Sequence, residues 1–163
     1  MKLIYSIVFV LTFFNYQSYN LHDIRKMYVA SSVSKTNALK FYDFMNNYSK
    51  NDETLLAYKG ASIAIKAKHT SGIKQKKEEF IKGITIVEAV IKSNPNNLEA
   101  RLIRLSIQEN TPKILKYKEN IESDKKQIVL LFNKQSVDLK LFIKEYVNQS
   151  KIFTEAEKQQ LNK

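Results

Sequence analysis

The chain has 163 residues, of which 44% are apolar, enough to bury the core of one domain. It contains no cysteine, which excludes disulfide bonds, thiolate metal sites, a cysteine nucleophile and a lipid-bearing cysteine. The net charge of +11 comes almost entirely from lysine, and nucleic-acid-binding proteins rely on arginine for base and phosphate contacts. We therefore interpret the charge as the coding bias of an A/T-rich genome and expect no nucleic-acid partner.

The first residues have the pattern of a secretory signal peptide. Met1 and Lys2 provide a positive start, and the apolar run 3–14 that follows is too short to span a bilayer as a helix. We expect export to the periplasm or cell envelope of a bacterium, with residues 1–18 as the signal peptide, cleaved near Ser18. An uncleaved, membrane-proximal anchor is the alternative.

Beyond this segment the apolar residues are spaced as in helices nearly everywhere, which predicts an all-α fold of about eight helices. The first two helices are expected around residues 21–28 and 39–48. Asp52 is a good N-cap for a third helix. The polar segment from His69 to Lys77 contains Gly72 and predicts a long loop.

A fourth helix is expected over residues 77–92 and ends before Pro95, because a residue that precedes proline is pushed out of the helical region. Asn96 or Asn97 is a suitable cap for a fifth helix over residues 98–109.

The last third of the chain predicts three more helices. Thr111 is expected to cap a new helix, with Pro112 as its first residue. Helix 121–132 ends in five successive apolar residues, which indicates burial on more than one side. Helix 137–147 follows, and Thr154 begins a capping-box pattern for a short final helix. Because no linker rich in Pro, Gly or Ser interrupts the pattern, we expect residues 19–163 to form a single all-α domain.

The segment 80–97, FIKGITIVEAVIKSNPNN, resembles the second helix and exit turn of a tetratricopeptide (TPR) repeat, and LAYKGASI at 56–63 resembles its first helix. The resemblance implies antiparallel helical hairpins, a TPR-like or α-solenoid-like small bundle, in which Gly60 and Gly83 face each other and let two helices approach closely. It covers one repeat, lacks the consensus tryptophan and carries an insertion of about 11 residues against the 34-residue repeat length. The overall layout is also similar to small exported proteins of Bacteroidota.

Motifs for catalysis are missing from the sequence. The only histidines, His22 and His69, have no metal-binding or nucleophile motif around them, and the three glycines are too scattered to cradle a phosphate. We therefore expect no enzymatic activity, no cofactor and no metal site.

Arg101 and Arg104 are the most unusual residues, because they lie in an apolar helix where a repeat packs large apolar side chains. They share a face with Gln108, and burial of arginine requires compensating carboxylates. The preferred interpretation is a structural ion-pair network. The alternative is an anion-binding or ligand-binding site built on the two guanidinium groups. The candidate acidic partners are Glu88, Glu119, Glu122 and Asp124.

A cluster of lysines between Lys66 and Lys77 surrounds the expected loop. It predicts at most a weak contact with an anionic membrane surface, and a solvated loop is the alternative. Taken together, the sequence favours a non-catalytic exported scaffold or adaptor that binds another protein. A small-ligand or anion carrier, or a hydrolase with a site around Arg101 and Arg104, is the alternative.

Overall fold

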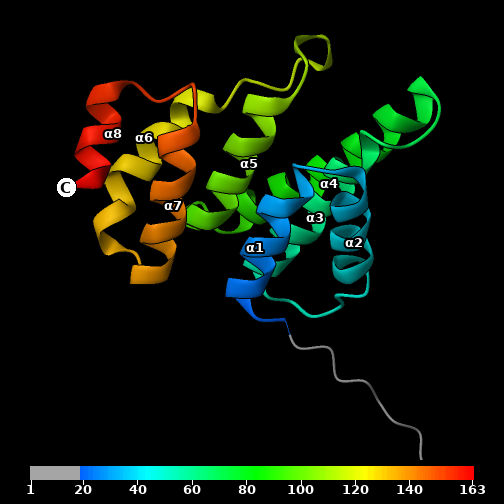
Figure 1. Cartoon of the computed structure of the whole chain (residues 1–163), viewed down its shortest axis with the longest axis horizontal. Helices are drawn as coiled ribbons and strands as arrows, with labels where there is room; N and C mark the ends of the chain where they lie inside the picture. The colour runs from blue at the N-terminus through cyan, green and yellow to red at the C-terminus, as the bar shows by residue number, and fades with distance from the viewer. Residues whose placement is uncertain (1–18) are drawn as a thin grey trace, which may run out of the picture.

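The computed structural model describes residues 19–163, and this part of the chain consists of helices joined by loops, with no strand (Figure 1). The predicted all-α fold is confirmed. The elements in chain order are α1 (Leu21–Ser31), α2 (Lys35–Asn46), α3 (Glu53–Ala67), α4 (Ile73–Ser93), α5 (Leu98–Asn110), the 3-10 turn η1 (Lys113–Leu115), α6 (Ile121–Leu131), the 3-10 turn η2 (Phe132–Lys134), α7 (Val137–Gln149) and α8 (Glu155–Asn162).

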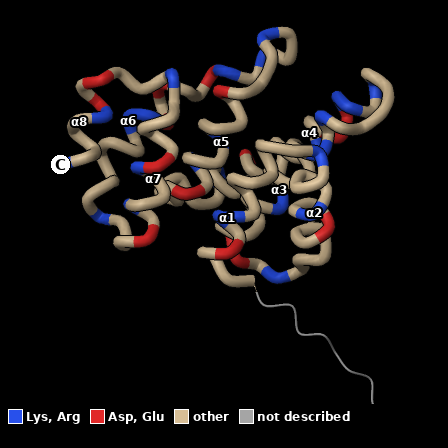
Figure 2. Tube along the Cα trace, viewed as in Figure 1, with Lys and Arg blue, Asp and Glu red and all other residues tan. Residues whose placement is uncertain are grey.

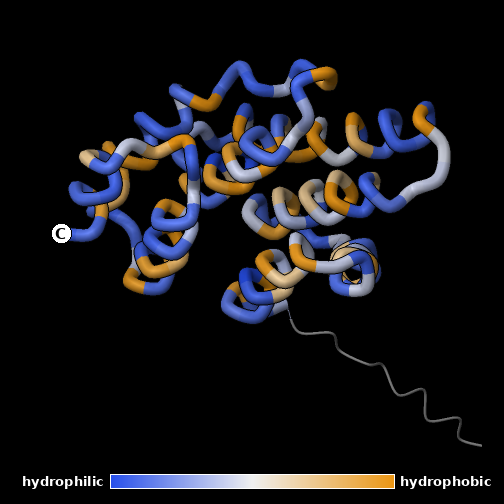
Figure 3. Tube along the Cα trace, turned by 45° about the horizontal axis from the view of Figure 1, so that its top comes forward, coloured by the Kyte–Doolittle hydropathy of each residue, from blue (hydrophilic) through white to orange (hydrophobic). Residues whose placement is uncertain are grey.

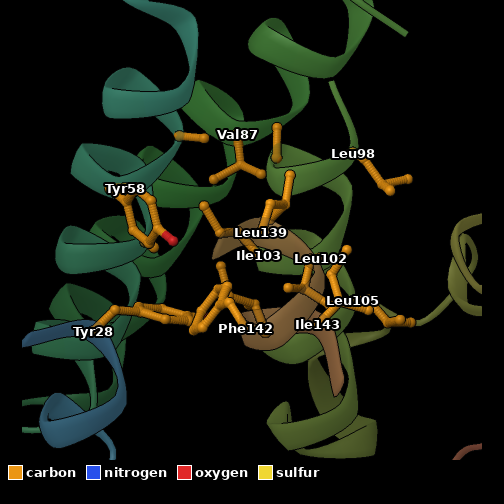
Figure 4. Close-up of a cluster of buried hydrophobic side chains, with 14 of the residues drawn as sticks. Tyr28, Tyr58, Val87, Leu98, Leu102, Ile103, Leu105, Leu139, Phe142 and Ile143 are labelled. Carbon is orange, nitrogen blue, oxygen red and sulfur yellow. The ribbon is translucent and has the colours of Figure 1, made fainter. Parts of the chain in front are cut away.

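Helix α5 lies at the centre of the bundle, between α1–α4 on one side and α6–α8 on the other (Figure 1). It packs against α3 and α4 and also against α6. Figure 4 shows the resulting core, in which Ile103 of α5 lies between aromatic side chains of the first half and apolar side chains of α7. Ile103 is fully buried, as are Tyr58 of α3 and Ile143 of α7. The central position of α5 explains why its sequence is apolar on most sides.

Helices α3 and α4 form an antiparallel hairpin whose axes approach closely at two glycines. A Cβ atom placed on Gly60 would lie 2.7 Å from the carbonyl oxygen of Gly83, and one on Gly83 would lie 2.6 Å from the carbonyl oxygen of Gly60. Neither distance is possible for a real side chain, so only glycine permits this contact. The predicted close approach of these two glycines is confirmed.

Side-chain caps mark most helix starts. Asp52 accepts a hydrogen bond from the backbone of Leu55 and begins α3 as predicted, and Thr154 begins α8 with a complete capping box. Of the two asparagines considered for α5, Asn97 is the cap and accepts from the backbone of Ala100 at 2.9 Å. Each cap satisfies an amide that the helix itself leaves unpaired.

The predicted loop from His69 to Lys77 is wrong at its C-terminal end, because α4 begins at Ile73. The connection is only residues 68–72, and Gly72 adopts a left-handed φ of 82° that favours glycine. Residues 71–78 are all exposed, so the first turns of α4 project without an apolar stripe. The periodicity that marks a helix is absent there for this reason.

The prediction for Thr111 and Pro112 is also wrong. Thr111 ends α5, with its hydroxyl donating to the carbonyl of Ile107 at 2.6 Å, and Pro112 precedes only the 3-10 turn η1. For the run 128–132, burial was expected on more than one side; Ile128 and Phe132, which lie one turn apart, are buried, whereas Leu130 is 64% exposed. An apolar run indicates burial only where a neighbouring element covers it.

The signal segment 1–18 and its cleavage position near Ser18 lie outside the described residues. Among residues 19–163, no helix combines the length and the apolar character needed to cross a membrane.

Candidate functional site

Helix α5 directs Arg101 and Arg104 toward α6. The cap at Asn97 fixes where α5 begins, and the two arginines lie three residues apart on one face, as the sequence predicts. Arg101 also donates from Nε to the carbonyl oxygen of Pro95 at 2.7 Å, which ties it to the turn before the helix.

Asp124 of α6 is the shared acceptor of both arginines. Arg104 donates from Nε to Oδ2 and from Nη2 to Oδ1, both at 2.7 Å, in a bidentate pair. Arg101 Nη1 donates to the same Oδ1 at 2.7 Å. The Asp124 side chain is fully buried, while those of Arg104 and Arg101 are 6% and 12% exposed. The planar fork of arginine matches a carboxylate in this way, and lysine does not.

Glu88 of α4 completes the network. Its Oε2 accepts from Arg104 Nη1 at 2.6 Å and its Oε1 accepts from the hydroxyl of Tyr117 at 2.6 Å. Burial lowers the pKa of Arg104, but the hydrogen bonds and charges of Asp124 and Glu88 outweigh this effect and raise the pKa above its ordinary value. Burial and the hydrogen bond to Glu88 together raise the pKa of Tyr117. Both groups therefore keep their protons at neutral pH.

Two of the four acidic residues considered as partners belong to this network, Glu88 and Asp124. Glu119 is exposed, and Glu122 lies 3.5 Å from Lys125 Nζ instead. The two guanidinium groups and the two carboxylates balance in charge. The carboxylate of Asp124 occupies the position between both guanidinium groups that a bound anion would need. The network therefore links α4, α5 and α6 and leaves no position between the two guanidinium groups for an external anion.

A second buried cluster, centred on Glu99 of α5, was not predicted from the sequence. Arg25 of α1 forms a bidentate pair with Glu99 at 2.8 and 2.7 Å, and the hydroxyl of Tyr58 donates to Glu99 Oε1 at 2.6 Å. The pair to Glu99 raises the pKa of Arg25, and burial raises that of Tyr58 well above its usual value. Arg25 and Glu99 are 74 residues apart. The one sequence signal was that Arg25 is the third arginine in a lysine-rich chain.

The C-terminal end of α5 has a third cluster. Glu109 accepts from the hydroxyl of Tyr146 at 2.6 Å, from the hydroxyl of Ser150 and from the backbone of Lys151 at 2.8 Å. Burial and the bond to Glu109 raise the pKa of Tyr146. Each of the three clusters thus joins α5 to a different group of helices.

Gln108 shares the face of Arg101 and Arg104 as the sequence predicts, but it behaves differently. Its side chain is fully buried, and neither its amide nitrogen nor its amide oxygen has a hydrogen-bond partner. A buried amide without a hydrogen-bond partner destabilises the folded state and so lowers the free energy of unfolding.

Of the two histidines, His22 is exposed and His69 is half-buried. His22 and Arg25 line a cleft of about 490 Å³ at the starts of α1, α3 and α7, whose other lining residues are Tyr19, Asn20, Leu21, Asp52, Leu55, Ser136 and Asp138. Neither Arg101 nor Arg104 belongs to it. Asn20, Asp52 and Ser136 each use a side-chain oxygen to cap a helix. Three of the polar groups that line the cleft are therefore committed to helix caps.

Within residues 19–163, no three His, Asp or Glu side chains gather closely enough to hold a metal ion. Comparison of the chain with models of protein families, with curated proteins and with solved structures finds no match.

Proposed function

We propose that the chain is a non-catalytic exported helical-repeat protein that acts as a scaffold or adaptor in the cell envelope by binding another protein. The observation that carries this proposal is the internal pairing of Arg101 and Arg104 with Asp124 and Glu88. Residues that would otherwise be the best candidates for ligand chemistry are used to join helices. The binding capacity that remains lies on the outer faces of the helices.

A helical-repeat interpretation is supported by the α3–α4 hairpin. Its paired glycines and the turn of Pro95 to Asn97 that follows are the features that resemble a TPR repeat. In repeat proteins of this type the stacked helices present extended faces to protein partners.

We place the protein-binding face on either side of the α6–α7 turn. Leu130, Val137 and Leu141 are 64%, 71% and 56% exposed there, and the last two lie one helical turn apart on α7. We call these three residues the α6–α7 face. Large apolar side chains that are exposed together mark contact sites more often than single ones do.

A photo-crosslinking amino acid at Leu141 tests this proposal in the native envelope. The control is the same amino acid at Val33, which is 79% exposed between α1 and α2. We expect one protein to be crosslinked through position 141 and not through position 33, and the crosslink to be lost in the Leu130→Glu variant. Equal crosslinking at both positions, or none at either, contradicts the proposal.

The alternative, a carrier of small anions with a site at Arg101 and Arg104, requires Asp124 to give up its place between the guanidinium groups. Calorimetric titration of the purified protein with inorganic phosphate tests it directly. Saturable binding that disappears in Arg101→Lys would favour the carrier over the scaffold.

Export is part of the proposal and has its own test. Expression of the full chain in a bacterial host, followed by mass measurement of the protein in the envelope fraction, identifies its first residue. A mature N-terminus close to residue 19 supports export with cleavage near Ser18, whereas an intact Met1 supports the anchored alternative.

A further inference from the structure

Two projections at one edge of the molecule each carry a nearly fully exposed isoleucine. Ile73 begins α4 and is 88% exposed, and Ile114 lies in η1 and is 86% exposed. Figures 1 and 3 both place the start of α4 and η1 at the upper edge, away from the main body of the bundle. We call residues 68–77 and residues 112–118 the two tips.

Both tips are basic and contain no acidic residue. The first has Lys68, Lys74, Lys76 and Lys77, all exposed, and the second has Lys113 and Lys116, also exposed. Figure 2 shows the basic positions of both segments, and Figure 3 shows an apolar position within each. Lys66 is not counted, because it pairs with Glu79 at 3.0 Å beside the ring of Tyr42. Exposed lysines thus flank both exposed isoleucines, and the nearest acidic residues in sequence, Glu78 and Glu119, lie just beyond the tips.

Both tips are attached to α4. Tyr117, directly after η1, packs edge-on against Phe80 of α4, with ring centroids 5.8 Å apart. The hydroxyl of Tyr117 donates to Glu88 of the same helix. These contacts anchor the end of the second tip to α4, the helix that the first tip begins.

We propose that the two tips dock the protein on an anionic phospholipid surface. Lysine side chains next to such a surface gain electrostatic attraction to the headgroups, and an apolar side chain between them enters the boundary of the acyl region. A single-stranded nucleic acid would instead need aromatic side chains on which bases stack, and both isoleucines would remain in water. Charge and apolar exposure at the same two positions favour the lipid surface.

This inference is independent of the proposed protein partner. The α6–α7 turn lies at the opposite edge of the view in Figure 1, so docking through the tips leaves the α6–α7 face accessible.

The absence of cysteine permits a direct test on the full chain. Ile73→Cys, Ile114→Cys and the control Val137→Cys are each labelled with an environment-sensitive dye; position 137 is 71% exposed and apolar, but lies beyond the α6–α7 turn. Vesicles of phosphatidylcholine with phosphatidylglycerol should shift the emission of the dye to the blue at positions 73 and 114 and not at 137. An equal shift at all three positions, or with pure phosphatidylcholine, overturns the proposal.

Charge variants separate a specific surface from net charge. The triple variant Lys74→Gln, Lys76→Gln, Lys77→Gln should weaken vesicle partition by roughly fivefold per lysine removed. The control removes the same charge from exposed lysines elsewhere, at Lys126, Lys134 and Lys151. Equal weakening by both triple variants contradicts docking through the tips.

Vesicle binding that leaves the dyes at positions 73 and 114 unchanged also contradicts it, as would occur if residues 1–18 alone inserted into the membrane. Salt-sensitive binding to single-stranded DNA without any response to vesicles would identify a nucleic-acid surface instead.

Discussion

Removal of Arg104 tests whether the network around Asp124 is structural. In Arg104→Met, Asp124 loses both bonds of its bidentate pair and keeps only Arg101, while it remains fully buried. Breaking a buried ion pair by removing one partner costs about 3–5 kcal/mol. Because Arg101 still compensates part of the charge, we expect the lower end, about 3 kcal/mol. For a chain of this size that loss lowers Tm by roughly 6–12 °C.

Thermal unfolding followed by far-UV circular dichroism measures the effect. The control is Lys126→Met, which removes one positive charge from an exposed position on α6 and should change stability by less than about 0.5 kcal/mol. An Arg104→Met protein whose Tm equals that of the parent would refute the structural interpretation of the network.

Three further predictions concern other parts of the bundle. Gly60→Ala should destabilise the protein by about 1–3 kcal/mol in chemical denaturation. Alanine normally favours a helix, so a stabilised variant would contradict the close α3–α4 contact. Gln108→Leu should leave the free energy of unfolding unchanged or raise it, because it removes a buried amide without a partner; a loss above about 2 kcal/mol would show that the amide is needed. Burial raises the pKa of Tyr28 to about 12, so its contribution to stability is complete below about pH 10 and is lost as the pH rises toward 12. Helical circular dichroism should fall over this interval as tyrosinate absorbance appears, less steeply in Tyr28→Phe; a flat helical signal through pH 12 would contradict this assignment.

Local patterns predicted most of the helices because the information they need lies within a few residues. Asp52 and Thr154 act through amides three positions away, and the contact of Gly60 with Gly83 follows from their resemblance to facing small positions of a helical hairpin. The start of α4 was missed because residues 73–78 are all exposed and carry no apolar stripe. A helix that projects into solvent lacks the signal by which helices are detected.

The ion-pair clusters show where sequence reasoning ends. Asp124 and Glu88 could be placed among four candidates, because neighbouring helices had to supply carboxylates for a buried arginine. The partner of Arg25 is 74 residues away on a helix that packs across the bundle, and no local pattern connects the two. The exposure of Ile73 and Ile114 could not be predicted from the sequence either, because it depends on which segments the rest of the fold leaves uncovered.

The central position of α5 has a consequence for the order in which the chain folds during synthesis. Glu99 finds its partners Arg25 and Tyr58 upstream, so its charge is neutralised as soon as α5 is complete. Arg101 and Arg104 need Asp124, which is made 20 residues after Arg104. In a nascent chain that ends near residue 110, Glu99 therefore already has both partners, whereas Arg104 has only Glu88 as a carboxylate partner and Arg101 has none. We expect residues 19–110 alone to leave the side of α5 that faces α6 and α7 uncovered; synthesis of α6 supplies Asp124, and α7 and α8 then complete the bundle.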